Sequence, residues 1–168
     1  EWSYEGPKSL SETFYPKENK FDDFDDQKLP MYMVFWGTPA KDCWKIEDSC
    51  LKLKCIRQRL DDDLEQMKMD GILADDKYVA FVSRRQCAMD AVITAAVKFY
   101  PEGQESAGIA AVQAMNHQIH IERACEDGKQ VVRVVVITAD YIQPPYFPGF
   151  TSTTNREIIC SEAYDKSE

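Results

Sequence analysis

The sequence predicts an all-β fold, and three observations lead to this prediction. Short apolar runs recur at a spacing of roughly 8–12 residues, turn signals separate most of them, and the strongest run, 131–137, is almost entirely Val and Ile. This pattern favours an eight-stranded antiparallel up-and-down barrel. An α+β fold is the alternative, with helices over 46–69 and 84–118 beside a small sheet. The alanine-rich stretches 88–100 and 106–116 leave it open, because they fit a helical stripe as well as a period of two.

The barrel requires a strand at each apolar run. Met31–Trp36 is apolar and aromatic and ends at Gly37, and 51–55 alternates between apolar and charged residues as a half-buried strand does. Glu126–Lys129 is a hairpin-type turn, and the apolar run that follows it predicts a strand buried on both faces. The eight predicted strands are 31–37, 50–58, 64–69, 77–83, 91–100, 106–115, 117–125 and 130–141.

Length and charge limit the organisation and the partners of the chain. Its 168 residues fit one domain, which we expect at 31–168, preceded by an irregular, acidic and aromatic arm at 1–30. The 29 acidic residues exceed the 20 basic ones and give a net charge of -9, which argues against nucleic acid and anionic membranes as partners. No apolar run approaches the ~20 residues of a membrane span.

Cysteine usage points to the compartment. The six cysteines are Cys43, Cys50, Cys55, Cys87, Cys125 and Cys160. Their even number predicts three disulfides in a secreted, extracellular protein, with the pairing left open. The chain starts at Glu1 without a signal-like apolar stretch, so we interpret it as a mature chain whose targeting segment is gone. Six buried free thiols in a cytosolic protein are the alternative.

Three segments carry a resemblance to a known family. They are Tyr32–Val34 leading into Thr38–Cys43, then Val134–Pro144, and finally Arg156–Cys160. In their order and spacing they resemble the salivary lipocalins of ticks. Two features depart from that family's pattern. Prolines in 143–150 forbid the helix that usually follows the last strand, and Val135 stands where amine-binding members carry an acid.

The resemblance implies a fold and a function. It implies an eight-stranded barrel around a ligand cavity, in a secreted, non-enzymatic protein that takes part in immune evasion. Such proteins sequester host mediators such as histamine, serotonin, leukotrienes or other lipids. Some members bind host proteins instead. The alternative function is therefore a secreted immune modulator or inhibitor that acts through its surface and holds no small ligand.

The residues of the last predicted strand favour one ligand class. A buried amine requires a carboxylate, and a strand reading Val-Val-Val-Ile offers none, so we expect an apolar or anionic lipid such as a fatty acid or leukotriene. If Val135 points inward, so do Arg133 and Ile137, and Arg133 can then hold an anionic head group. A position outside or at the rim is the alternative for Arg133. The full set of expected ligand-binding residues is Tyr32, Trp36, Phe81, Phe99, Tyr100, Arg133, Val135 and Ile137, and ordinary core packing is the alternative for the aromatic ones.

Nothing in the sequence predicts catalysis. It contains no Gly-x-Ser-x-Gly elbow and no Gly-rich phosphate loop. His120 and Glu122 share a face if 117–125 is a strand, but no third ligand is evident, so no metal and no cofactor are expected.

Overall fold

The computed structural model describes residues 21–40, 42–62, 79–87, 90–114, 116–141 and 152–164. Its strands are β1 (Met33–Phe35), β2 (Trp44–Glu47), β3 (Cys50–Leu53), β4 (Val82–Arg84), β5 (Ala107–Ala114), β6 (His117–Glu126), β7 (Lys129–Tyr141) and β8 (Ser152–Ala163). The prediction of an all-β protein is confirmed. The alternative helices over 46–69 and 84–118 do not occur in the described parts of those ranges. In all the residues that the structure describes, no helix is long and apolar enough to cross a membrane.

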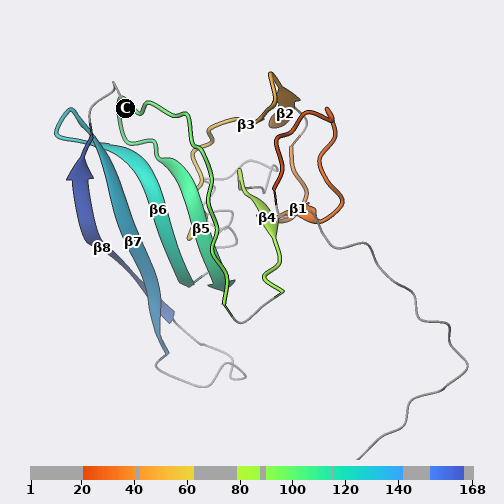
Figure 1. Ribbon diagram of the computed structural model, residues 1–168. Helices are drawn as coiled ribbons and strands as arrows, with labels where there is room; N and C mark the ends of the chain where they lie inside the picture. Colours follow the sequence, from red (N-terminus) through yellow and green to blue (C-terminus); the bar gives the residue numbers. More distant parts are fainter. Residues whose placement is uncertain are drawn as a thin grey trace, which may run out of the picture.

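The four longest strands form one antiparallel sheet in the order β5-β6-β7-β8. Figure 1 shows these strands side by side as a curved sheet. The predicted hairpin turn joins β6 to β7, and Asp127 and Gly128 take φ values of 51° and 76° there. Two successive positive φ angles fit the twist of a two-residue hairpin turn, and Asp-Gly is a preferred pair for it. This turn places Glu126 opposite Lys129 and so fixes the register of the two strands.

The predicted closed barrel is wrong. Within the described residues, the remaining strands pair as two separate ribbons, β1 with β4 and β2 with β3, and Figure 1 shows both on the far side of β5 from β8. A barrel needs hydrogen bonds from each strand to the next around the whole circuit. The predicted strand 91–100 forms no strand, so the circuit is interrupted before β5.

The individual strand predictions have mixed outcomes. The runs 106–115, 117–125 and 130–141 are confirmed as β5, β6 and β7. The predicted strands at 31–37 and 50–58 shorten to β1 and β3, and the one at 77–83 becomes β4. Residues 64–69 lie outside the described part of the chain, as do residues 1–20 of the predicted arm. The described end of that arm, 21–30, forms neither helix nor strand.

Strand β8 was not predicted, because its sequence has few apolar residues. Its position follows from pairing with β7, which extends from Val131 opposite Ala163 to Tyr141 opposite Ser152. A bulge between Val134 and Val135 shifts the register in the middle of the pair. Backbone hydrogen bonding along a long, strongly β-forming neighbour therefore places a strand that the apolar pattern does not mark.

The two faces of the sheet differ in burial. We call the face that carries Val135 and Ile137 the buried face, because these side chains are 0% and 1% exposed. The opposite face, which we call the open face, carries Ile119 and Ile121 at 52% and 46% exposure. Successive residues of a strand alternate between the two faces. The described core therefore lies on one side of the sheet.

Gly108 provides a test of the sheet's packing. A Cβ built on Gly108 would lie 2.7 Å from the Cα of Glu122 on the neighbouring strand, and it would also meet the carbonyl oxygen of Ile121. We expect Gly108→Ala to lower the free energy of unfolding by about 1–3 kcal/mol in urea denaturation, because the strands must move apart. Gly103→Ala is the control, since its Cβ would meet only the flexible carboxylate of Glu105 at 3.0 Å. Equal stability of the two variants would contradict the close approach of β5 and β6.

Candidate functional site

A charged network occupies the buried face of the sheet. Its centre is Glu122 in β6, which is 6% exposed. The Oε1 atom of Glu122 accepts hydrogen bonds from Nε of Arg133 at 2.8 Å and from Nη2 of Arg156 at 3.1 Å. Its Oε2 atom accepts one from Oγ of Ser106 at 3.0 Å. A buried carboxylate is tolerated only when charged or polar partners of this kind compensate for its lost hydration.

Further acids balance the two arginines. Nη1 of Arg133 donates to Oε1 of Glu126 at 2.9 Å, and the other carboxylate oxygen of Glu126 accepts from Oγ of Ser161 at 2.8 Å. Nη1 of Arg156 donates to Oδ1 of Asp61 at 2.9 Å. The hydrogen bonds from Arg133, and next to them the one from Ser161, lower the pKa of Glu126 below its usual range. The network therefore joins β6, β7 and β8 to the segment around Asp61.

His120 lies next to the network on the same face. Its Nε2 atom is 2.6 Å from Oε1 of Gln118, and its Nδ1 atom is 3.9 Å from Oε2 of Glu122. Burial lowers the pKa of His120, and this effect outweighs the attraction of the Glu122 carboxylate. Gln118 in turn donates through Nε2 to the carbonyl oxygen of Leu60 at 3.3 Å. A row of three polar side chains on β6 is thus satisfied by strand neighbours and by the segment 60–61.

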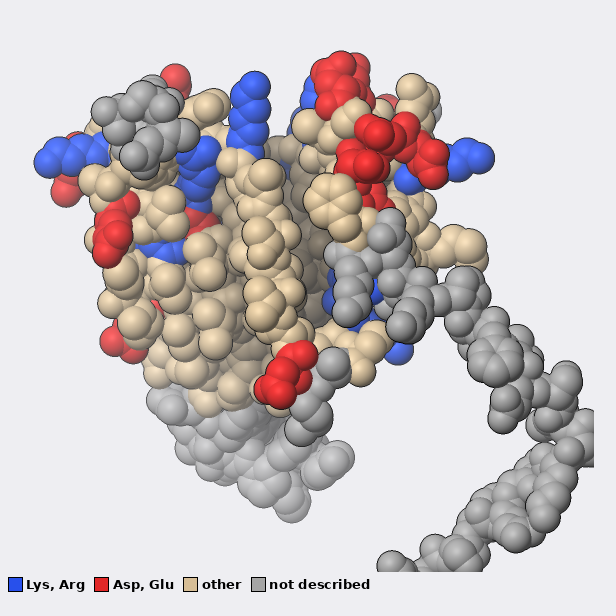
Figure 2. Space-filling model, in the orientation of Figure 1, with Lys and Arg blue, Asp and Glu red and all other residues tan. Residues whose placement is uncertain are grey.

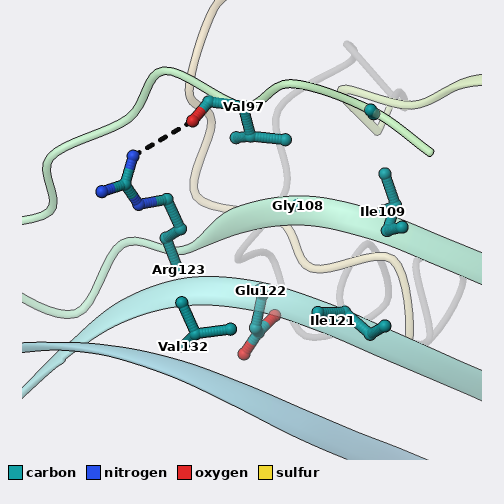
Figure 3. A pocket seen from close by; sticks show the side chains of 8 residues that line it. Val97, Gly108, Ile109, Ile121, Glu122, Arg123 and Val132 are labelled. Atoms are coloured by element: carbon teal, nitrogen blue, oxygen red, sulfur yellow. Dashed lines mark hydrogen bonds between the residues drawn. The ribbon is translucent and has the colours of Figure 1, made fainter. Parts of the chain in front are cut away.

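A small hollow lies on the other side of the sheet, where the segment 95–97 crosses the open face. Its volume is about 160 Å³, and Val97, Ile109, Ile121 and Val132 line it. Figure 3 shows Glu122 pointing away from this hollow, while Nη1 of Arg123 reaches the carbonyl oxygen of Val97 at 3.0 Å. Ligand pockets usually exceed about 300 Å³ and place several polar groups around the ligand. The hollow therefore has neither the size nor the lining of a binding pocket.

Comparison with known families decides the identity of the chain. Residues 21–148 match the family described as the β-xylosidase C-terminal concanavalin A-like domain. The chain belongs to this family. No curated protein and no solved structure gives a match.

Membership in the β-xylosidase C-terminal domain family corrects the predicted resemblance. The chain is not a tick salivary lipocalin, and the lipid-binding or histamine-binding function that the resemblance implied is wrong with it. Concanavalin A-like domains are β-sandwiches, which agrees with strands that do not close into a barrel. The three segments that suggested a lipocalin are too short to define a family, because strand residues followed by a Pro or Cys occur in many all-β folds.

The ligand-binding residues predicted near the N-terminus surround the β1–β4 ribbon. The hydroxyl of Tyr32 donates to Oδ2 of Asp22 at 2.7 Å, and the guanidinium of Arg84 lies 4.4 Å from the centre of the Tyr32 ring. The rings of Trp36 and Phe81 are 6.2 Å apart at a tilted angle. Aromatic pairs at this separation contribute to packing. These residues hold the two strands of the ribbon together.

The other predicted residues lie in two further places. Phe99 and Tyr100 belong to the segment before β5, where Tyr100 is 47% exposed and its ring lies 5.1 Å from the guanidinium carbon of Arg123. Arg133, Val135 and Ile137 do share one face of β7, as their alternation predicted. The described structure brings the eight predicted residues into no common cavity, and Arg133 is occupied by two carboxylates.

Sequence reasoning missed the network as a unit. His120 and Glu122 do share a face, but the Glu122 carboxylate accepts hydrogen bonds from the guanidinium groups of Arg133 and Arg156. Asp61, which accepts a hydrogen bond from Arg156, was not among the predicted site residues. In the sequence, Gln118, His120 and Glu122 alternate with isoleucines, which does indicate a strand with one polar and one apolar face. Such a pattern usually predicts that the apolar face is the buried one, whereas here the polar face is buried.

All six cysteines lie in the described part of the chain, and none is paired in the structure. Cys43 is buried and Cys125 is half-buried, whereas Cys50, Cys55, Cys87 and Cys160 are exposed. The three predicted disulfides stay a prediction.

Removing the charge at the centre of the network tests its contribution. We expect Glu122→Gln to lower the free energy of unfolding by about 3–5 kcal/mol, because two guanidinium groups lose their shared buried partner. Chemical denaturation measures this change. Glu47→Gln is the matched control: that carboxylate binds Lys45 and Lys52 on the exposed β2–β3 ribbon, where ion pairs contribute little. A loss no larger for Glu122→Gln than for Glu47→Gln would refute the role of the network.

The lowered pKa of His120 predicts a pH dependence. As the pH falls, the unfolded chain binds a proton at His120 near pH 6.5, and the folded chain binds it only at a lower pH. The stabilisation of the folded state that depends on an uncharged His120 is therefore fully present above about pH 6.5. It is lost as the pH falls from there through the folded-state pKa of His120. We expect the urea midpoint of the wild type to drop between pH 7 and pH 5. In His120→Gln this drop should be smaller, whereas His117→Gln serves as the control. Parallel pH profiles of wild type and His120→Gln would exclude His120 as the titrating group.

Proposed function

We propose that this chain is a non-catalytic module that accompanies a glycoside hydrolase of the β-xylosidase type. The observation that carries the proposal is the family match over residues 21–148, which covers most of the chain. The description of the family names a C-terminal domain of a β-xylosidase. A module of this kind assists an enzyme without performing the reaction itself.

The hydrogen bonds of two carboxylates, the buried Glu122 and the half-buried Glu126, support a non-catalytic role. Glycoside hydrolysis uses two carboxyl groups, one of which must be protonated to donate a proton to the leaving group. Glu126 has a lowered pKa because of Arg133 and Ser161, which is the opposite of what a general acid requires. Both oxygens of Glu122 are occupied by arginine and serine donors. These two acids are engaged in holding the sheet together.

The expected compartment belongs to the proposal as well. Six cysteines in 168 residues favour an oxidising, extracellular environment, where three disulfides would form. The net charge of -9 makes a nucleic-acid partner unfavourable in any compartment.

Hydrolysis assays test the proposed function. We expect the purified chain to release no nitrophenol from 4-nitrophenyl β-D-xyloside and no xylose from xylo-oligosaccharides above the buffer rate. An authentic β-xylosidase serves as the positive control. Release of nitrophenol or xylose by the purified chain above the buffer rate would show that it is itself an enzyme and would end the proposal.

A further inference from the structure

Two adjacent arginines, Arg84 and Arg85, stand at the end of β4. They are the only two neighbouring basic residues among the 20 basic residues of the sequence. Both are exposed, and so are Gln86 and Cys87 after them. Residues 85–87 form neither helix nor strand. Exposed, irregular segments of this kind are where proteases preferentially cut a folded chain.

Several contacts of this segment are of kinds that break easily. The β1–β4 ribbon pairs three residues of each strand, and a two-stranded ribbon of this length is marginally stable by itself. The guanidinium of Arg84 lies 4.4 Å from the centre of the Tyr32 ring, an interaction that contributes little at an exposed site. The carbonyl oxygen of Arg85 accepts a hydrogen bond from Sγ of Cys87 at 3.5 Å, and a thiol is a weak donor. The end of β4 can therefore fray and present residues 84–87 in extended form.

The chain that follows the arginines is accessible as well. Residues 91–100 form neither helix nor strand, and Val92 and Ile93 are 96% and 64% exposed. In Figure 2 this segment stands out as a largely uncharged ridge on the surface, at the place where Figure 1 draws its trace. A protease that binds residues on both sides of the bond it cuts can therefore approach from this side.

Two other exposed arginines, Arg57 and Arg59, lie in a more constrained segment. The carbonyl oxygen of Leu60 accepts a hydrogen bond from Gln118, and the carboxylate of Asp61 accepts one from Arg156. These contacts attach the segment to the four-stranded sheet. Cleavage there would have to break them, so residues 84–87 are the easier substrate.

The two arginines also divide the chain between two groups of strands. β1 to β4 precede Gln86 and β5 to β8 follow it, and no described strand of one group pairs with a strand of the other. A cut after Arg85 therefore leaves every described strand pair intact. The hydrogen bonds from Gln118 to Leu60 and from Arg156 to Asp61 would still connect the two pieces.

We propose that the Arg85–Gln86 peptide bond is a processing site for a serine protease that recognises paired basic residues. Water adds across this bond, so that Arg85 gains a carboxylate and Gln86 gains an amino terminus. An acidic pocket of the protease would receive the guanidinium of Arg85, and a second acidic subsite would receive that of Arg84. This inference goes beyond the proposed function and does not depend on it.

The cysteines predict how the two pieces stay joined. Three of them precede the cut and three follow it, namely Cys43, Cys50 and Cys55 in 1–85 and Cys87, Cys125 and Cys160 in 86–168. Each piece thus holds an odd number of cysteines. If the three predicted disulfides form, at least one of them must connect the pieces. The processed protein is then a disulfide-linked pair of chains.

Digestion of the purified chain, followed by mass spectrometry, tests the site. The probes are a subtilisin-type processing protease specific for paired basic residues and, separately, trypsin, each at a low ratio to the chain. We expect both proteases to cut first after Arg85 and to release 1–85 and 86–168. Arg85→Gln should slow this cut by about a hundredfold or more with both, because the acidic pocket is left without its partner.

The variant Arg84→Gln separates recognition from access. It should slow the processing protease about tenfold or more, because the second subsite loses its charge. It should leave trypsin at least as fast, because the lost contact with Tyr32 can only loosen the end of β4. Arg57→Gln is the matched control: Arg57 is exposed and outside any strand, but it has no basic neighbour, so both rates should stay unchanged.

The outcomes decide each part of the proposal. A first cut at another residue, or no cut at all, would overturn the site, and equal rates of the processing protease on wild type and Arg84→Gln would overturn recognition of the pair. We expect the amide spectrum of the four-stranded sheet to survive the cut, and its loss would overturn the division into two intact groups of strands. Chain secreted from a eukaryotic host and then cut should run as one species without reductant and as two with it. Two species without reductant would overturn the disulfide connection.

Discussion

Glu122 carries the buried negative charge to which arginines from two other strands are bound. Arg133 lies in β7 and Arg156 lies in β8. Arg156 also donates a hydrogen bond to Asp61, in the segment that follows β3. In a low-dielectric interior each of these groups would be costly alone, so their positions depend on one another. The same interaction links three strands to one another and holds the segment around Asp61 against the buried face. It also explains why polar residues occupy the inner side of β6.

The strands that the sequence could predict are those in which local propensity and tertiary environment agree. Val131–Ile137 is strongly β-forming, and the Asp127–Gly128 turn demands positive φ angles, so β7 and its hairpin with β6 follow from local chemistry. Strand β8 could not be found in this way, because its residues acquire a partner only when β7 is in place. The segment 91–100 shows the opposite effect: its residues favour a strand, but no described neighbour pairs with it. A strand needs a hydrogen-bonding partner as well as suitable residues.

The site was harder to predict than the sheet for an electrostatic reason. The pattern 118–122 alternates between polar and apolar residues, and hydrophobicity alone would bury Ile119 and Ile121. The structure buries Gln118, His120 and Glu122 instead, because arginines distant in the sequence supply the compensating charge. Residue periodicity identifies two faces but cannot decide which one is inside when a distant ion pair stabilises the polar one. The lipocalin resemblance had a similar weakness, since it depended on short segments and not on the whole pattern that the family match uses.

Strand β8 lies beyond residue 148, where the family match ends, and yet it completes the sheet and supplies Arg156. The part of this chain that matches the family and the part that forms the sheet therefore differ at the C-terminal end. A recombinant fragment cut at the family boundary would uncover the hydrogen-bonding edge of β7 along its full length and would invite aggregation there. The same geometry makes the peptide 152–164 a natural complementing fragment, which could be supplied separately to restore the sheet. The boundaries of a recombinant form of this chain are thus better drawn from its strand pairing than from the extent of the family match.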